Sequence, residues 1–213
     1  MSEFGIRIMK TNEKEVKVER ETRESRIEAR IDSGERREFK INSGMQFLNH
    51  MIETIAWRAC MNIDLKTETT NYELKHVIAE DSGIVLGKAF AEILANRIPV
   101  GVNGSGCASA IIDEAKAFAA VSFEGRANCF VERNCDGSKI TEVDGMYACD
   151  LVAFLEGFAQ GGKLSARMDL EKGRDPHHTW ESGFRALGEA LKSALSPTPW
   201  RKNTTAGVKG TLK

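Results

Sequence analysis

The chain has 213 residues, enough to bury a sizeable core in one or two domains. Its 30 basic and 31 acidic side chains leave a formal net charge of −1, so neither nucleic acid nor an anionic membrane is expected as a partner. No apolar run is long enough for a spanning helix, and the start lacks the apolar segment of a signal peptide. An odd count of 5 cysteines without a C-x-x-C pair indicates reduced thiols, as in a cytoplasmic protein.

Two periodicities define the elements of the first half. Apolar residues that alternate with charged ones predict half-exposed strands, and apolar residues at 3- and 4-residue spacing predict helices. Ser43 is of a residue type that caps a helix start, so the first helix is expected from there. In chain order, we predict strands around 16–18, 27–31 and 39–41, a helix at 43–59, a strand at 63–66 and a helix at 76–94.

The second half repeats this order after a glycine-rich stretch at 99–106, which lacks periodicity and predicts a junction. We therefore divide the chain into a first repeat at 1–98 and a second repeat with a C-terminal tail at 99–213, within one structural domain. The predicted elements of the second half are strands at 115–123 and 128–131, a helix at 145–159, a strand at 164–168 and a helix at 177–195. Pro197 and Pro199 stop the last helix. The fold class is α+β with a two-fold internal repeat.

One arrangement of histidine and glutamate occurs twice in the chain. His76 and Glu80 are spaced like His177 and Glu181, which follow 101 residues later, and His178 adjoins the second pair. A histidine and a glutamate four residues apart project from one face of a helix, where neutral imidazole and carboxylate can bind one divalent metal ion. Three of the 4 histidines lie in this repeated element. The sequence therefore predicts a metal site, and a paired one.

Seven segments carry a resemblance to a known family through their order and spacing. They are R-E-T-R-E-S-R-I at 20–27, S-G-M-Q-F-L-N-H-M at 43–51, H-V-I-A-E-D-S-G-I-V-L-G at 76–87, I-D-E-A at 112–115, E-G-R at 124–126, H-H-T-W-E at 177–181 and G-V-K-G-T-L at 207–212. Together they resemble the imidazoleglycerol-phosphate dehydratase family over nearly the whole chain. The resemblance implies a lyase of histidine biosynthesis that removes water from imidazole glycerol phosphate.

The resemblance also implies two manganese ions per subunit. The candidate ligands are His50, His177 and Glu181 for one ion, and His76, Glu80 and His178 for the other. The family has one further histidine at each site, and here Val77 and Ser165 stand at the aligned positions. Two imidazoles and one carboxylate still form a set that binds a transition metal and leaves positions open. The chain is thus expected to be a divergent member of the family.

For the substrate, the resemblance assigns Glu24 as the acid or base near the reacting carbons and Asp113 as a further contact. Arg126 and Lys209 would hold the phosphate, for which a guanidinium and an ammonium are suitable partners. The family's second arginine and its tail serine fall on or near Gly104 and on Gly207. In the family's reaction the metals act as Lewis acids on the substrate imidazole.

The same resemblance implies the assembly and the detailed architecture. Four helices would lie between two antiparallel or mixed four-stranded sheets, as in the second domain of ribosomal protein S5. Trimers would build an assembly of 24 subunits in which neighbouring chains complete each active site. The expected partners are thus a small-molecule imidazole phosphate and further copies of the chain.

Other functions and structural roles fit the same residues. The chain would also fit a related metal-dependent enzyme with another substrate, or a noncatalytic descendant that acts in assembly or binding. A lone histidine is more often a hydrogen-bonded surface or core residue than a ligand. Glu24 would fit a solvated strand charge, and Lys209 a tail lysine. Arg126 would equally fit a surface ion pair with Glu124 or Glu132.

Overall fold

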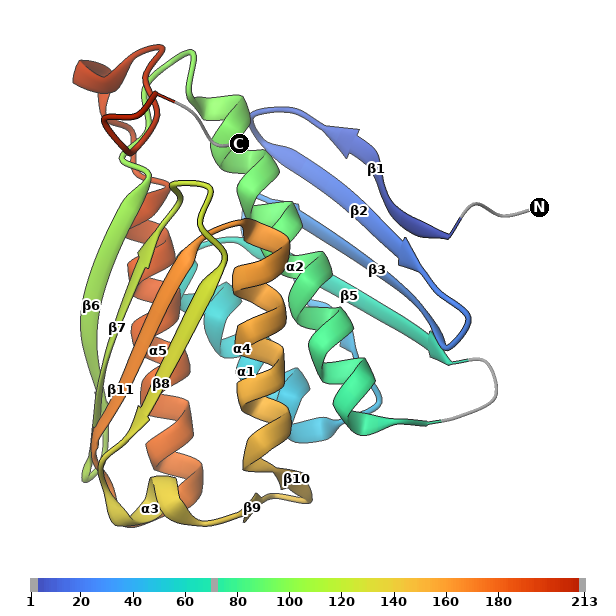
Figure 1. Cartoon of the computed structure of the whole chain (residues 1–213), viewed down its shortest axis with the longest axis vertical. Helices are drawn as coiled ribbons and strands as arrows, with labels where there is room; N and C mark the ends of the chain where they lie inside the picture. Colours follow the sequence, from blue (N-terminus) through green and yellow to red (C-terminus); the bar gives the residue numbers. More distant parts are fainter. Residues whose placement is uncertain (1–3, 70–72, 211–213) are drawn as a thin grey trace.

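Two β-sheets enclose four long helices in the computed structural model, which describes residues 4–69 and 73–210 (Figure 1). The helices are α1 (Gln46–Ala59), α2 (Lys75–Arg97), α4 (Ala148–Gly162) and α5 (Pro176–Ala194). All four were predicted from apolar spacing, and each lies close to its predicted range. Within the described ranges, no helix is long and apolar enough to cross a membrane.

The first sheet contains one strand more than predicted. Its order is β1 (Gly5–Thr11), β2 (Glu15–Glu21), β3 (Ser25–Asp32), β5 (Asn62–Thr69) and β4 (Lys40–Asn42). The first four strands are antiparallel neighbours, and β4 pairs parallel to β5. The additional strand, β1, lies at the edge with Ile6 and Ile8 about 40% exposed. Apolar and charged residues alternate only from Ile6 to Ile8, and Met9 breaks the pattern where the register shifts, so the run is too short to predict a strand.

The second sheet repeats the topology of the first. Its order is β6 (Ser105–Ile112), β7 (Ala115–Ser122), β11 (Ser165–Lys172) and β8 (Asn128–Arg133). Strand β8 is parallel to β11, as β4 is to β5, and the other pairs are antiparallel. The α+β class and the repeat are thus confirmed. The division between residues 98 and 99 remains a prediction.

Strand β6 begins inside the stretch that was predicted as a junction. A Cβ at Gly106 would lie 2.2 Å from Ala190 O and 2.8 Å from Ala194 N on α5, so only glycine allows this approach of strand and helix. Residues 105–110 of the strand are all small, and large apolar side chains occur only at its last two positions, Ile111 and Ile112, so the alternation that marks a strand in a sequence is missing. Gly106, which was part of the predicted junction, allows β6 to pack closely against α5.

Two predicted helix starts were wrong by a few residues. Helix α1 has Met45 at its N-cap, while Ser43 Oγ accepts the Met45 N–H at 3.2 Å and donates to Asn49 Oδ1 at 2.7 Å. Ser43 therefore stabilises the segment before the helix through these hydrogen bonds.

Helix α4 begins three residues later than predicted. Asp144 and Gly145, with φ of 45° and 76°, form the turn of a short hairpin that precedes the helix. Left-handed backbone at two successive residues is typical of a two-residue Asp-Gly turn. The hairpin strands are β9 (Glu142–Val143) and β10 (Met146–Tyr147), preceded by the short helix α3 (Asp136–Lys139).

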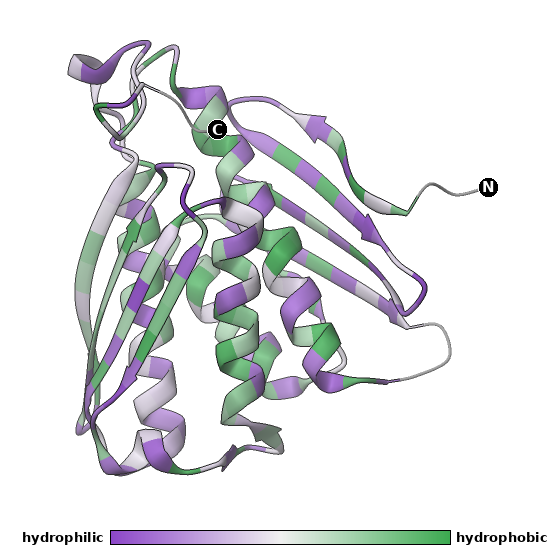
Figure 2. Cartoon of the chain, in the orientation of Figure 1, coloured by the Kyte–Doolittle hydropathy of each residue, from purple (hydrophilic) through white to green (hydrophobic). Residues whose placement is uncertain are grey.

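Helices α2 and α4 cross at the centre of the molecule with backbone against backbone. A Cβ at Gly83 would lie 2.1 Å from Phe154 O, and a Cβ at Gly157 would lie 2.2 Å from Glu80 O. In Figure 2 apolar (green) and polar (purple) residues alternate along the strands, and the helices between the sheets carry bands of both colours. The crossing fixes the distance between α2 and α4, and both helices begin at the lower end of the molecule in Figure 1, as α5 does.

The five cysteines are unpaired and differ in their surroundings. Burial, with a smaller contribution from the charge of Glu156, raises the pKa of the Cys129 thiol to about 12. Since the thiolate is the reactive form, Cys129 should react with iodoacetamide at pH 8 on the order of 10- to 100-fold more slowly than exposed Cys107. Peptide mass spectrometry after timed labelling measures both rates, with urea-unfolded protein as the control. Equal rates in the folded protein would contradict the burial of Cys129.

Candidate metal centre and substrate site

Three of the six predicted metal ligands converge in the structure. His50 projects from α1, and His177 and Glu181 lie one turn apart on α5. One ring nitrogen of each histidine and one oxygen of the glutamate lie within 4.8 Å of one another. His50 Nε2 is 3.3 Å and His177 Nε2 is 3.2 Å from Glu181 Oε2. The start of α5 is fixed by Asp175, whose side chain accepts the His178 N–H, and by Pro176 in the first turn.

The charge state of Glu181 suits a metal ligand. Burial alone would raise its pKa, but hydrogen bonds from Arg185 and His50 outweigh burial and lower the pKa below its usual value. Arg185 donates two hydrogen bonds, of 2.9 and 2.7 Å, to Glu181 Oε1, which leaves Oε2 directed at the two imidazoles. Two imidazole nitrogens with one carboxylate oxygen are donors that a divalent first-row transition metal accepts. The three residues therefore fit a metal ion of this class.

The other three predicted ligands are not brought together within the described part of the chain. His76 lies at the start of α2 with Nδ1 3.4 Å from Asp150 Oδ1 on α4. His178 Nδ1 is 3.0 Å from Glu114 Oε2, and Glu80 is half-buried on α2. Helix α2 packs on α4 and the first sheet, whereas α5 packs on α1 and the second sheet. Assembly of this second set within one chain is thus not observed.

Glu24 lies in the exposed turn between β2 and β3, which is attached to helix α2. Its neighbour Ser25 donates a 2.8 Å hydrogen bond to Asp81 Oδ2, and Arg20 Nη1 forms a 2.6 Å ion pair with the same oxygen. Asp81 is buried and directly follows Glu80. Sequence reasoning missed the roles of Arg20 and Asp81, although both lie inside the matched segments. Their pairing holds the Glu24 turn beside the first turns of α2.

Arg126 lies at the opposite end of the molecule from the histidines. It sits in the turn between β7 and β8, where its backbone carbonyl accepts a 3.3 Å hydrogen bond from Ser165 Oγ. Ser165 begins β11 and Lys172 ends it just before α5, so the strand separates Arg126 from His177 by about 23 Å at 3.3 Å per residue (Figure 1). Ser165 therefore does not face the cluster of His50, His177 and Glu181.

The tail approaches the Arg126 turn. A Cβ on Gly207 would lie 3.0 Å from the carboxylate of Glu124, and Lys209 is exposed two residues further on. Thr211 and Leu212, which complete the tail motif, lie outside the described residues. Arg126 makes no ion pair in the described ranges, since Glu124 bonds Ser122 and Glu132 pairs with Arg167. Arg126 and Lys209 thus lie at one end of the fold as two exposed cations.

Asp113 and Glu114 occupy the turn between β6 and β7, beside His178. Asp113 has a left-handed φ of 45°, and its Oδ2 is 3.4 Å from His178 Nε2. Glu114 Oε1 accepts the backbone N–H groups of Asp175 and Arg174 at 2.9 and 3.0 Å. These bonds, with that from His178, lower the pKa of Glu114 to about 2. This turn is thus tied to the start of α5, where the metal ligands lie.

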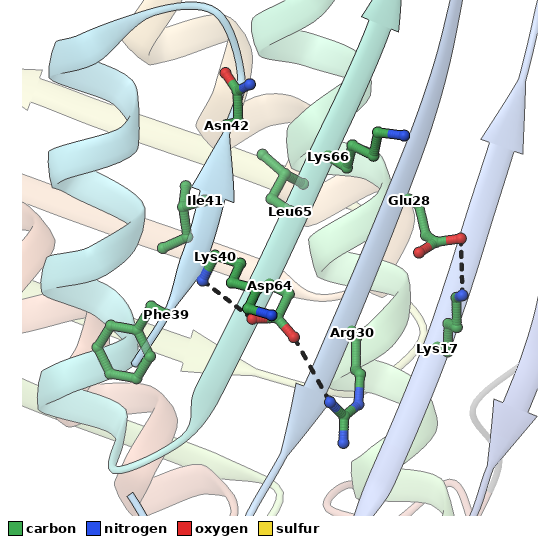
Figure 3. A pocket seen from close by; sticks show the side chains of 10 residues that line it. All are labelled: Lys17, Glu28, Arg30, Phe39, Lys40, Ile41, Asn42, Asp64, Leu65 and Lys66. Carbon is green, nitrogen blue, oxygen red and sulfur yellow. Dashed lines mark hydrogen bonds and ion pairs between the residues drawn. The ribbon is translucent and has the colours of Figure 1, made fainter. Parts of the chain in front are cut away.

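The cluster borders a cavity of about 350 Å³ that is lined by His50, Glu53, Thr54, Trp57, Arg58, Glu181 and Arg185. A larger cavity, of about 490 Å³, lies on the outer face of the first sheet (Figure 3). Its charged side chains pair with one another, as Lys17 does with Glu28 and Arg30 with Asp64, and no histidine lines it. Chemistry rather than volume therefore favours the smaller cavity as the substrate site.

Comparison with known proteins identifies the family. The model of the family described as imidazoleglycerol-phosphate dehydratase matches residues 43–191, which is more than half of the chain. An imidazoleglycerol-phosphate dehydratase from Methylococcus capsulatus is 32% identical over 198 residues, covering 92% of this chain and 95% of the relative. One from Acinetobacter baumannii (strain SDF) is 33% identical over 196 residues, covering 92% and 94%.

Solved structures agree. The enzyme of the same family from Pyrococcus furiosus superimposes with a TM-score of 0.75 at 25% identity, over 90% of this chain and 98% of its own. The structure from Staphylococcus aureus has a TM-score of 0.74 at 22% identity, covers 86% of this chain and 99% of its own, and supports the fold. As the motifs of its sequence indicated, the chain belongs to the imidazoleglycerol-phosphate dehydratase family.

Proposed function

We propose that this chain is a metal-dependent hydro-lyase that removes water from imidazole glycerol phosphate in histidine biosynthesis. The observation that carries the proposal is the convergence of His50, His177 and Glu181 from two helices around one point, in a member of this family. The metal is manganese, with two ions per subunit. The free state of all five cysteines supports a cytoplasmic location.

The chemistry divides among residues of this chain. His50, His177 and Glu181 would hold one metal ion, and His76, Glu80 and His178 would hold the other. When bound, the metal supplies Lewis-acid polarisation of the substrate imidazole. Glu24 holds or accepts a proton on its carboxylate beside the reacting carbons, and Asp113 contacts the substrate from the β6–β7 turn. Arg126 and Lys209 bind the phosphate and orient the substrate.

An active site of this kind requires more than one copy of the chain. The metal ligands and the phosphate-binding residues lie at opposite ends of β11, about 23 Å apart. Imidazole glycerol phosphate is too short to contact both ends of one subunit. We propose that neighbouring chains in a 24-subunit assembly of trimers combine the histidine end of one subunit with the Arg126 end of another.

Metal analysis followed by an activity assay tests the proposal. Purified protein should contain or take up manganese, and should convert imidazole glycerol phosphate with loss of water. Glu24→Gln should abolish turnover while the protein keeps its fold and its metal, which a noncatalytic descendant would not show. Absence of turnover with manganese fully restored would contradict the named substrate.

Replacement of Arg126 tests the phosphate site. Arg126→Ala should raise the KM for imidazole glycerol phosphate on the order of 10- to 100-fold with a smaller change in kcat, because a charge-assisted contact to the phosphate is lost. Arg167→Ala is the matched control, since Arg167 is an exposed arginine of the same sheet that bonds Asp169. Equal KM values for the two variants would show that Arg126 does not bind the substrate phosphate.

One observation favours a second candidate, a related enzyme with a different small polyol or imidazole substrate. Gly104 has a φ of 79°, and a Cβ there would lie 2.4 Å from the Ala206 Cβ of the tail. The tail thus fills the space that a second arginine at this position would need. Screening of phosphorylated and unphosphorylated imidazole polyols would separate this candidate from the dehydratase.

A further inference from the structure

Each of three histidines has its Nδ1 atom beside a carboxylate that comes from a different element. His177 Nδ1 is 2.5 Å from Asp144 Oδ2 in the β9–β10 turn, and His178 Nδ1 is 3.0 Å from Glu114 Oε2 in the β6–β7 turn. His76 Nδ1 is 3.4 Å from Asp150 Oδ1 on α4. In all three, Nδ1 faces an acid, while Nε2 lies 3.2 Å from Glu181 Oε2 in His177 and 3.4 Å from Asp113 Oδ2 in His178.

The backbone holds these carboxylates independently of the histidines. Asp144 precedes Gly145 in the two-residue hairpin turn, and both have positive φ, which aspartate tolerates better than most residues. Glu114 uses Oε1 to accept two backbone N–H groups at the start of α5, so only Oε2 faces the ring. Asp150 is buried in the first turn of α4.

The chemical consequence concerns which nitrogen can bind a cation. A neutral imidazole has one N–H and one lone pair, so a carboxylate that accepts the proton at Nδ1 leaves the lone pair on Nε2. His177 Nε2 does face the cluster, 3.2 Å from Glu181 Oε2. We propose that Asp144 is a positioning residue that fixes Nε2 of His177 as the metal-binding atom, a role that rests on the proposed metal site.

The competing explanation is a set of surface ion pairs in which the histidines are protonated on both nitrogens. Asp144 is 55% exposed, and exposed ion pairs are common without function. A doubly protonated ring has no lone pair for a metal. The tautomer in the metal-free protein therefore distinguishes the two explanations without reference to turnover.

Nitrogen-15 NMR of the metal-free protein, labelled at histidine and measured above pH 8, gives this tautomer. The 4 histidines of the chain can be assigned by single replacements. We expect His177 to be protonated at Nδ1 only, and Asp144→Gly, which preserves the turn, to shift its ring toward the Nε2–H form. Asp136→Gly is the control, because Asp136 pairs with Lys139 and no histidine. An Nε2–H tautomer of His177 in the unaltered protein would overturn the proposal.

Manganese titration followed by electron paramagnetic resonance gives the second measurement. Asp144→Gly and Asp144→Asn should weaken Mn²⁺ binding about 10- to 100-fold, the usual effect of removing such an orienting carboxylate, while Asp136→Gly binds normally. Unchanged binding in both Asp144 variants would refute the positioning role. An unaltered protein that shows the Nδ1–H tautomer but binds no Mn²⁺ would refute the proposed metal site itself.

Discussion

Gly87→Ala should destabilise the fold by about 3 kcal/mol or more, a large part of the 5–15 kcal/mol typical of a folded domain. A Cβ at this position would lie 2.0 Å from Phe158 O and 2.8 Å from Gly162 N, both backbone atoms of α4. No rotamer change relieves these contacts, so α2 and α4 would have to separate. Urea unfolding followed by circular dichroism measures the loss.

The control for this substitution is Gly34→Ala. The only atom that a Cβ would meet there is the carboxylate oxygen of Asp32, at 3.2 Å, in an exposed turn. The free energy of unfolding should change by about 1 kcal/mol or less. Equal stabilities of Gly87→Ala and Gly34→Ala would show that the helices are not as close as described.

Glu181→Gln should remove most of the proposed activity. The amide keeps the size of the side chain but lacks the negative charge that the metal and Arg185 both use. Metal affinity and kcat/KM should each fall on the order of 100-fold or more, since even an orienting residue contributes 10- to 100-fold. Equilibrium dialysis against Mn²⁺ and an assay with imidazole glycerol phosphate measure the two effects.

Glu189→Gln provides the comparison on the same helix. Glu189 lies two turns beyond Glu181 and pairs with Arg58 and Lys192 at 3.7 and 3.8 Å. It contacts none of the proposed ligands, so activity and metal content should stay within about twofold of the unaltered protein, as for a surface ion pair. Wild-type turnover by Glu181→Gln would exclude the cluster as a catalytic metal site.

The fold was largely predictable because most elements have one buried face. The stripe from Leu48 to Ala59 and the alternation around Val16 and Ile27 each place apolar atoms on one side, and the structure buries those sides. The missed strands lack this signal. Strand β1 is exposed on both faces, and β6 packs on α5 through small residues such as Gly106.

The candidate site was predictable in kind but only partly in arrangement. The spacing of His177 and Glu181 on one helix fixed their proximity, whereas the addition of His50 depends on how α1 packs against α5. That packing is not visible in local periodicity, and the resemblance supplied it. The carboxylates beside the histidines could not be found in this way, since Asp144 and Glu114 reach them only through tertiary contacts.

The separation of Arg126 from the histidines along β11 bears on inheritance and engineering. If each catalytic centre draws half of its groups from one protomer and half from its neighbour, a defective chain impairs centres that it shares with intact chains. Conversely, two inactive variants, one altered at Arg126 and one at His177, should regain part of their turnover when they are expressed together. Hybrid particles would then contain centres to which both protomers contribute their undamaged ends.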